Sequence, residues 1–305
     1  MRQPVIRSEL LKRRLDAFAR MLKGTEKGDV RALHRARVAS RRLRELMPML
    51  QLGHGVSRKL TRRLRSVTAR LGAVRELDVL LLSIDELHVS RRARGAALGR
   101  VGVTVSKDRD RARKRLATEL PAADVRRLVR KLEHIVSDLQ ASEAASSRDA
   151  TRSWRWAVDA RVARRATRLS EAIAEAGAVY LPERLHGVRV ALKKTRYAVE
   201  LAHDVSLGRD DGDLRTLKRG QELLGRMHDL QILTERVRQE QASLAPPLLA
   251  DWRDLDALIV SLEDDCRRLH ARYMSLRDAV SAIADRATAR AHVVPARVAA
   301  ARRAG

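Results

Sequence analysis

The stretch LHRARVASRRLRELM (Leu33–Met47) returns in altered form half a chain later as LHGVRVALKKTRYAV (Leu185–Val199). Placed on a helix at about 100° per residue, each stretch separates into a basic face and an apolar face. The basic faces carry His34, Arg37, Arg41 and Arg44 in the first copy, and His186, Arg189, Lys193 and Arg196 in the second. The opposite faces carry Ala36, Ala39, Leu43, Leu46 and Met47, and Val188, Ala191, Ala198 and Val199. Each stretch is therefore predicted to form an amphipathic helix with one cationic side.

A second motif follows each of these stretches at almost the same separation, LGAVRELDVL at Leu71–Leu80 and LGRMHDLQIL at Leu224–Leu233. Between the two motifs, basic residues recur at matching offsets: Arg62 and Arg65 in the first half, Arg215 and Lys218 in the second. Two motifs in the same order and spacing indicate two copies of one helical unit. The matching cations indicate a surface that both copies share.

The rest of the chain has apolar residues at helical spacing and no convincing alternating run, so we predict an all-α protein of antiparallel helical bundles. Breaks are expected at residues 23–29, 52–57, 89–92, 121, 206–213 and 246–247. The small, polar segment 140–153 is the best boundary between two halves. We therefore expect bundles over residues 1–145 and 146–285, with Trp154 and Trp156 packing between them, and a frayed basic tail over residues 286–305.

Composition limits the class of protein. Of 305 residues, 64 are Lys or Arg and 38 are Asp or Glu, a net charge of +26 that indicates a polyanionic partner. Cys266 is the only cysteine, which excludes an intramolecular disulfide and a cysteine-rich metal cage. The N-terminus lacks an apolar signal core, and no run of roughly 18 uncharged apolar residues occurs. We expect a protein of the cytoplasm.

No acidic residue interrupts the basic face between His34 and Arg44. Like charges at these helical spacings cost roughly 0.2 to 0.5 kcal/mol per pair, a cost that is easier to understand if an anionic ligand neutralises them. Arginine suits phosphate oxygens in particular, because its planar fork donates two parallel hydrogen bonds.

The duplicated pair Leu-His-x-x-Arg-Val-Ala-x-Arg-Arg-x-Arg and Leu-Gly-x-x-Arg-Glu-Leu-Asp-Val-Leu resembles the CHAD domain, the conserved histidine α-helical domain. The resemblance covers Glu9 to about Ala284. It implies two helical bundles related by a pseudo-twofold axis, with long helices lining a basic central groove that binds inorganic polyphosphate. It also implies association with polyphosphate granules in bacteria and frequent fusion to a CYTH triphosphatase domain. Granule proteins or a separate CYTH or polyphosphate-metabolising enzyme, such as a polyphosphate kinase, are candidate partners.

Carried over by position, the family's histidines fall on His34 and His186. The resemblance then assigns polyphosphate contacts to Arg37, Arg41, Arg42, Arg44, Arg75, Arg189, Lys193, Lys194, Arg196 and His228. Glu76 departs from the Asp that is common at its position. A third basic helix in each half matches loosely, at Arg111 and Arg115 and at Arg268 and Arg272.

Three alternatives remain open on the residues alone. The basic faces could be solvated surface, and His34 and His186 could be structural. A nucleic-acid-binding protein would have the same charge, but three Trp, three Tyr and one Phe offer few stacking platforms. An enzyme acting on phosphate chains would need a phosphate-binding Gly-rich loop, a Glu-x-Glu-x-Lys signature or a metal site; His228-Asp229 alone is weak evidence for one. We expect a non-enzymatic protein without metal or cofactor.

Overall fold

The computed structural model describes the backbone of residues 6–26, 29–89, 96–145, 148–205, 211–244 and 249–303. The all-α prediction is confirmed, since these ranges contain helices and no strand. The helices are α1 (Arg7–Glu26), α2 (Val30–Leu46), η1 (Met47–Met49), α3 (His54–Val89), α4 (Ala96–Glu119), α5 (Ala122–Ala144), α6 (Arg148–Ala176), α7 (Pro182–Val205), α8 (Asp211–Ala242) and α9 (Leu249–Arg303).

Local signals in the sequence set several helix ends. The Asp29 side chain accepts a hydrogen bond from the Arg31 amide (2.7 Å) and caps α2. Pro182 opens α7 at a position where its missing N–H is harmless. Gly177 ends α6 with a φ of +63°, a left-handed conformation that glycine adopts without strain. The expected breaks near residues 23–29, 52–57 and 121 occur, whereas those near 89–92, 206–213 and 246–247 fall mainly outside the described residues.

The expected boundary 140–153 and the expected tail 286–305 both contain helical backbone, and both stay predictions. Within the proposed boundary 140–153, α5 continues to Ala144 and α6 begins at Arg148, so both helices extend into it. The backbone of the expected tail is helical as well, because α9 runs to Arg303. Both segments are rich in Ala, Arg, Glu or Gln, which favour a helix even where no apolar face is present.

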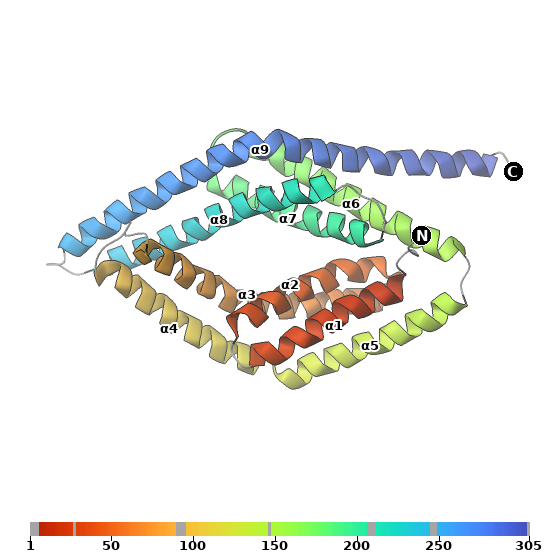
Figure 1. The fold of residues 1–305 in the computed structure, drawn as a ribbon, viewed down its shortest axis with the longest axis horizontal. Coiled ribbons are helices and arrows are strands. Elements are labelled where there is room, and N and C mark those ends of the chain that lie inside the picture. Colours follow the sequence, from red (N-terminus) through yellow and green to blue (C-terminus); the bar gives the residue numbers. More distant parts are fainter. Residues whose placement is uncertain are drawn as a thin grey trace.

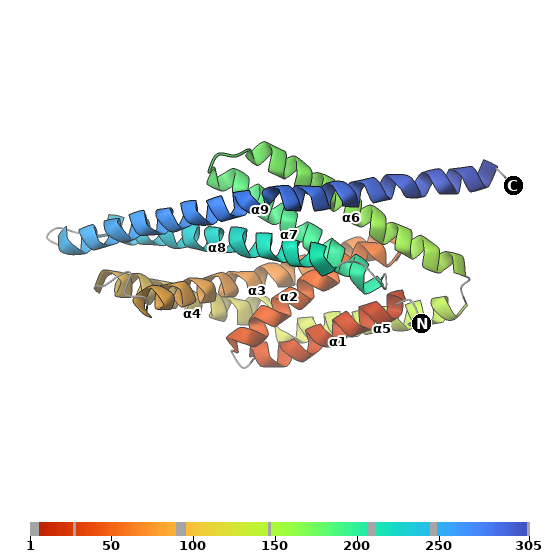
Figure 2. The ribbon, with the colours of Figure 1, turned by 45° about the horizontal axis from the view of Figure 1, so that its top comes forward.

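The helices are arranged around the pair α2 and α7, which contact each other near the middle of the molecule. In Figure 1, α2 and α3 lie on one side of the centre and α7 and α8 on the other. Figure 2 shows the same relation from a second direction, with α9 running along α8 and crossing α6. The two motif-bearing stretches, far apart in sequence, thus lie next to each other.

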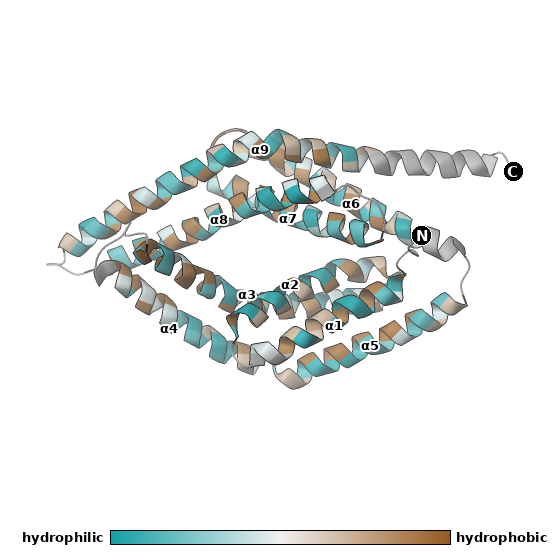
Figure 3. Ribbon diagram, in the orientation of Figure 1, coloured by the Kyte–Doolittle hydropathy of each residue, from teal (hydrophilic) through white to brown (hydrophobic). Residues whose placement is uncertain are grey.

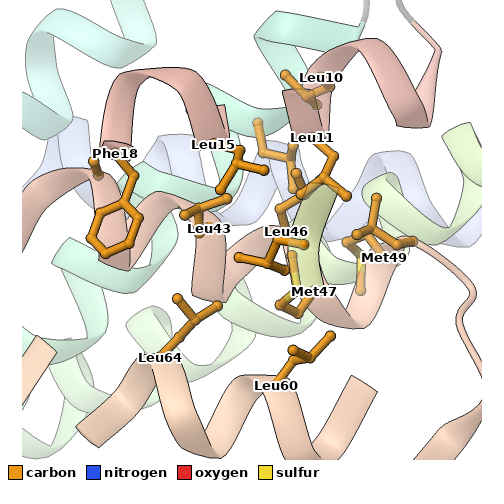
Figure 4. Packing of buried hydrophobic residues seen from close by; sticks show 14 of the residues in the cluster. Leu10, Leu11, Leu15, Phe18, Leu43, Leu46, Met47, Met49, Leu60 and Leu64 are labelled. Atoms are coloured by element: carbon orange, nitrogen blue, oxygen red, sulfur yellow. The ribbon is translucent and has the colours of Figure 1, made fainter. Parts of the chain in front are cut away.

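Two apolar clusters form the core. The first joins α1, α2, α5 and the N-terminal part of α3, and it includes Phe18, Leu43, Leu46 and Met47, each fully buried (Figure 4). The second joins α4, α8, α9 and the C-terminal part of α3. Apolar and polar residues alternate around most helices, as Figure 3 shows, so each helix buries one side. No helix in the described ranges is long and apolar enough to cross a membrane.

The two clusters do not coincide with the expected bundles 1–145 and 146–285. Helix α3 contributes Leu60 and Leu64 to the first cluster and Ile84 to the second. Helix α6 likewise places Trp154 in the first cluster and Leu169 in the second. Trp154 is buried, as expected of a packing residue, while Trp156 is exposed. Because α3 and α6 are long enough to reach both clusters, the halves share their cores, and the division of the chain into two domains stays a prediction.

A buried carboxylate fastens α2 to α6. Glu45 is 4% exposed and accepts a hydrogen bond from Arg161 (2.7 Å), and Arg165 lies 3.4 Å from its carboxylate oxygens. Burial acts to raise the pKa of Glu45, but the two arginines outweigh it and the pKa is lowered. The stabilisation is therefore present above the ordinary value of 4.5 and is lost as the pH falls below it.

We expect Glu45→Gln to lower the free energy of unfolding by roughly 2 to 4 kcal/mol, because it leaves two partly buried guanidinium groups without their counter-charge. The measurement is urea unfolding followed by circular dichroism at pH 7. Glu171→Gln on the exposed side of α6 is the matched control and should change stability by less than about 0.5 kcal/mol. Equal effects of the two substitutions would contradict the role of Glu45.

Candidate functional site

The cationic faces of α2 and α7 are brought together in the structure. Arg37, Arg41 and Arg44 of α2 act electrostatically on Lys193 of α7, and Arg41 also acts on Arg189 of α7. All five side chains are partly buried. We call Arg37, Arg41, Arg44, Arg189 and Lys193 the α2–α7 cluster. The apolar residues on the far side of each helix, such as Leu43 and Val188, are buried as expected.

Lys193 lies in the least favourable position of the α2–α7 cluster for a positive charge. Burial and then the charges of Arg41, Arg189, Arg37 and Arg44 lower its pKa to about 7. The pKa values of Arg44 and Arg189 are lowered in the same direction, with burial as the largest cause. The cluster is therefore a set of like charges that the fold holds together in partial shelter from water.

Arg37 is held in place by the second motif of its own half. A Cβ atom at Gly72 would lie 3.2 Å from Arg37 Nε, so the side chain of Arg37 lies against a residue that has no side chain. Glu76 Oε1 is 3.5 Å from Arg37 Nη2. Burial and Arg41 lower the pKa of Arg37 to about 10 despite this acid. The longer carboxylate at position 76 thus pairs with Arg37 on α2.

In the second half of the chain, the acid and the arginine at the corresponding positions also act on each other. Asp229, which aligns with Glu76, is the acid that acts most strongly on Arg189, which aligns with Arg37. Burial raises the pKa of Asp229, although Arg189 opposes the shift. Gly225, which aligns with Gly72, differs, because nothing lies within 4 Å of the Cβ position there. The pairing of acid and arginine therefore recurs, and the duplication itself stays a prediction.

The histidines lie beside the α2–α7 cluster. The rings of His186 and His228 are 4.9 Å apart between centroids. Burial, Arg189, His186 and Lys193 lower the pKa of His228 to about 4, and burial followed by neighbouring cations lowers the pKa of His186 and His34 as well. All three are therefore mainly neutral at pH 7. His34 also lines a cavity of about 610 Å³ on the α1 side of α2, together with Arg35.

Other predicted contact residues have partners or neighbours outside the α2–α7 cluster. Arg42 and Arg196 both pair with Glu200 of α7, and Arg196 also donates to Gln221 (2.8 Å). Lys194 is influenced by Arg165 and Glu45, on the α6 side of α7. Arg42 and Arg196 therefore connect helices, while Lys194 is also influenced by Arg44 of the cluster.

The remaining predicted residues lie around the cluster or farther away. Arg65 and Arg75 are near enough to influence Arg44 and His34, respectively. Arg62 and Arg215 are exposed, and Lys218 lies 3.8 Å from Glu222. On the third helices, Arg111 pairs with Asp108 and Arg268 with Asp265, while Arg115 and Arg272 are exposed. The assignment of phosphate contacts to individual residues stays a prediction.

Sequence reasoning missed the acids that organise the site. Glu200 lies four residues after Arg196, a helical spacing that indicates their pair. Its second partner, Arg42, lies on another helix and leaves no signal in the sequence. Asp78 of the second motif lies 3.8 Å from Arg113 of α4 and is equally a tertiary contact. Among the described residues, no group of three or more His, Cys, Asp or Glu side chains could hold a metal ion.

The fold is all-α, and its helices α2 and α7 contact each other and bring their cationic faces together. Residues 9–238 match the sequence pattern of the CHAD domain, and the chain belongs to that family. The match ends within α8, short of the limit near Ala284 that the motifs indicated.

Two solved structures share the fold. The crystal structure of the CHAD domain from the plant Ricinus communis is 24% identical, with a TM-score of 0.57 over 91% of this chain and 90% of that one. PptA from Streptomyces chartreusis is 21% identical, with a TM-score of 0.55 over 93% of this chain and 97% of that one. No curated protein matches the chain by sequence.

The two aligned glycines allow a test of how Arg37 is held. Replacing a helical glycine by alanine usually stabilises by about 0.5 to 1 kcal/mol, and we expect this gain for Gly225→Ala. Gly72→Ala should gain clearly less, because the new methyl group displaces Arg37. Urea unfolding of both variants checks this expectation. Equal gains would mean that Arg37 does not depend on Gly72.

Proposed function

We propose that this protein binds inorganic polyphosphate at the α2–α7 cluster and does not alter it chemically. One observation carries the proposal: five cationic side chains from two helices are held together, and the acids named among the influences on them are three, Glu45, Glu76 and Asp229. A bound polyanion would supply the missing negative charge. Membership in the CHAD family supports the same ligand, since that family is linked to polyphosphate.

The chemistry of the cluster suits a chain of phosphates. Polyphosphate carries about one negative charge per phosphate, and arginine binds phosphate oxygens with two parallel hydrogen bonds. Four of the five cluster residues are arginines. The cluster needs no aromatic platform, because polyphosphate has no bases to stack.

The proposal extends to the place of the protein in the cell. A long polyphosphate chain offers many equivalent binding positions, so a protein that binds it without cleaving it accumulates wherever the polymer does. We infer a protein of the cytoplasm that associates with polyphosphate granules. Granule proteins and separate polyphosphate-metabolising enzymes, of the CYTH or polyphosphate kinase type, are its expected neighbours there.

We expect the double variant Arg37→Glu, Arg189→Glu to bind long-chain polyphosphate at least 100-fold more weakly than the natural protein. Each substitution removes one cation from a facing helix and adds a repelling charge. Binding is measured by titration with fluorescently labelled polyphosphate, and helical content by circular dichroism. The matched control is Arg130→Glu, Arg164→Glu, which reverses two exposed arginines on α5 and α6. If both double variants lose the same affinity, net charge and not the cluster governs binding.

We expect polyphosphate to displace duplex DNA from the protein at a much lower concentration of negative charge than DNA needs to displace polyphosphate. Both complexes should weaken steeply with salt through counterion release, so the competition is run at one fixed, moderate salt concentration. Displacement with equal ease in both directions would favour a nucleic-acid-binding protein. Release of inorganic phosphate from polyphosphate in the same mixtures would contradict the non-enzymatic part of the proposal.

A further inference from the structure

A cavity of about 720 Å³ lies between α4 and α5, and no residue of the α2–α7 cluster lines it. Helix α4 ends at Glu119 and α5 begins at Ala122. From this short connection the two helices diverge, because α4 packs on α3 whereas α5 packs on α1 (Figure 1). Side chains from α1, α2 and α3 complete the wall of the cavity between them.

The wall of this cavity is apolar, and part of it is open to water. Leu33 and Leu71 are buried, while Leu22, Leu116 and Val129 are only partly buried. The last three are packed against the first apolar cluster and extend it to the surface. Binding sites for small molecules have volumes of about 300 to 1,000 Å³ and mainly apolar walls with a few polar groups. The cavity has the size and lining of such a site.

Helix α5 gives the cavity one apolar edge and one cationic edge. At about 100° per residue, Val125 and Val129 lie beside the buried Leu132, whereas Arg126 and Arg130 fall on the side that faces solvent. All four of the Val and Arg side chains line the cavity. The two arginines are four residues apart, so they are neighbours on the helix surface. The positive charge is therefore concentrated at the rim.

Helix α4 adds a third cation, Arg113, to the lining. Its Nη2 atom lies 3.8 Å from Asp78 Oδ1, and its Nε atom is buried and donates no hydrogen bond within the described part of the chain. Glu133 is the one acidic residue among the described residues that line the cavity. An apolar interior with a mainly cationic rim is complementary to a molecule that has a long apolar chain and a negatively charged head group.

We propose that the cavity between α4 and α5 binds one molecule of a free long-chain fatty acid. The apolar chain packs against Leu22, Leu116 and Val129 and covers their exposed surface. The carboxylate lies at the rim, where Arg126 and Arg130 donate hydrogen bonds to it, since the arginine fork matches the two oxygens of a carboxylate. This site is separate from the α2–α7 cluster and does not depend on the function proposed there.

The test is a fluorescence titration of the full chain with cis-parinaric acid, a long-chain fatty acid that becomes fluorescent in apolar surroundings. The methyl ester of the same acid has the same chain and no charge. We expect one molecule of the acid to bind per chain, and the ester to bind at least tenfold more weakly. Moderate salt in all titrations screens the general attraction of a basic protein for anions.

Two variants separate the cavity from the rest of the surface. Ala117→Phe places an aromatic ring at an exposed position in the lining of the cavity and should weaken binding of the acid at least tenfold. Its matched control is Ala141→Phe, at an exposed position of α5 outside the cavity, which should bind as the natural protein does. Circular dichroism checks that both variants are helical.

The rim is tested by Arg126→Ala combined with Arg130→Ala, which should remove most of the preference for the acid over the ester. Arg127→Ala combined with Lys131→Ala removes two exposed cations of α5 that do not line the cavity, and should keep that preference. An equal loss in both double variants would overturn the proposal, because net charge and not the rim would then select the acid.

Other outcomes would also overturn the proposal. Many molecules of the acid bound per chain, or full affinity in Ala117→Phe, would place the binding outside the cavity. Self-association of the natural protein in analytical ultracentrifugation that Ala117→Phe abolishes would show that a second copy of the chain covers the cavity. Binding to vesicles of anionic phospholipid that Ala117→Phe weakens, without binding of the free acid, would identify a membrane lipid as the ligand.

Discussion

Repulsion between two cationic helices is the constraint on which the rest of this structure depends. Like charges on an exposed helix cost roughly 0.2 to 0.5 kcal/mol per pair, and the cost rises as water is excluded. Burial on the far sides of α2 and α7 opposes it. Leu43, Leu46 and Leu192 are fully buried there, and each contributes about 1.5 to 3 kcal/mol. A few such residues per helix suffice to hold the cationic faces together.

The acidic residues near α2 and α7 leave most of the repulsion between the two cationic faces uncompensated. Glu45 pairs with Arg161 of α6 and also acts on Arg44 of the cluster, and Glu200 joins Arg42 to Arg196. Glu76 acts on Arg37 and Arg189, and Asp229 acts mainly on Arg189. The carboxylates thus fix helices and orient side chains, and the charge of the α2–α7 cluster stays largely uncompensated for a ligand to neutralise.

The position of the cluster follows from how the core is divided. Helix α7 packs its N-terminal part, with Leu185 and Leu192, into one apolar cluster and its C-terminal part, with Leu201, into the other. The cationic face of α7 therefore lies where the two apolar clusters meet. A polyanion bound there, as proposed, would contact helices from both sequence halves, and its binding would then stabilise the whole fold.

The histidines show how strongly the surroundings of a side chain decide its role. An isolated histidine near pH 7 is partly charged, and the motifs alone indicate a possible cation at His34 and His186. In the folded protein, burial and the neighbouring cations lower the pKa of both, as they do for His228. They are therefore mainly neutral at pH 7, and most of the positive charge of the site comes from arginine.

The sequence by itself determined the helical class and the basic and apolar faces of Leu33–Met47 and Leu185–Val199. It also determined that a glycine and an acidic residue stand at matching positions in the two copies of the second motif. These are local properties, set by helical periodicity and by spacing along one helix. Only the tertiary structure decided that α2 and α7 face each other, that Gly72 makes room for Arg37, and that Arg42 and Arg196 are joined to Glu200. It also decided that α3 and α6 carry both cores. Contacts between helices depend on packing across the whole chain, and a helix of mixed charge has several faces on which an arginine can find a partner.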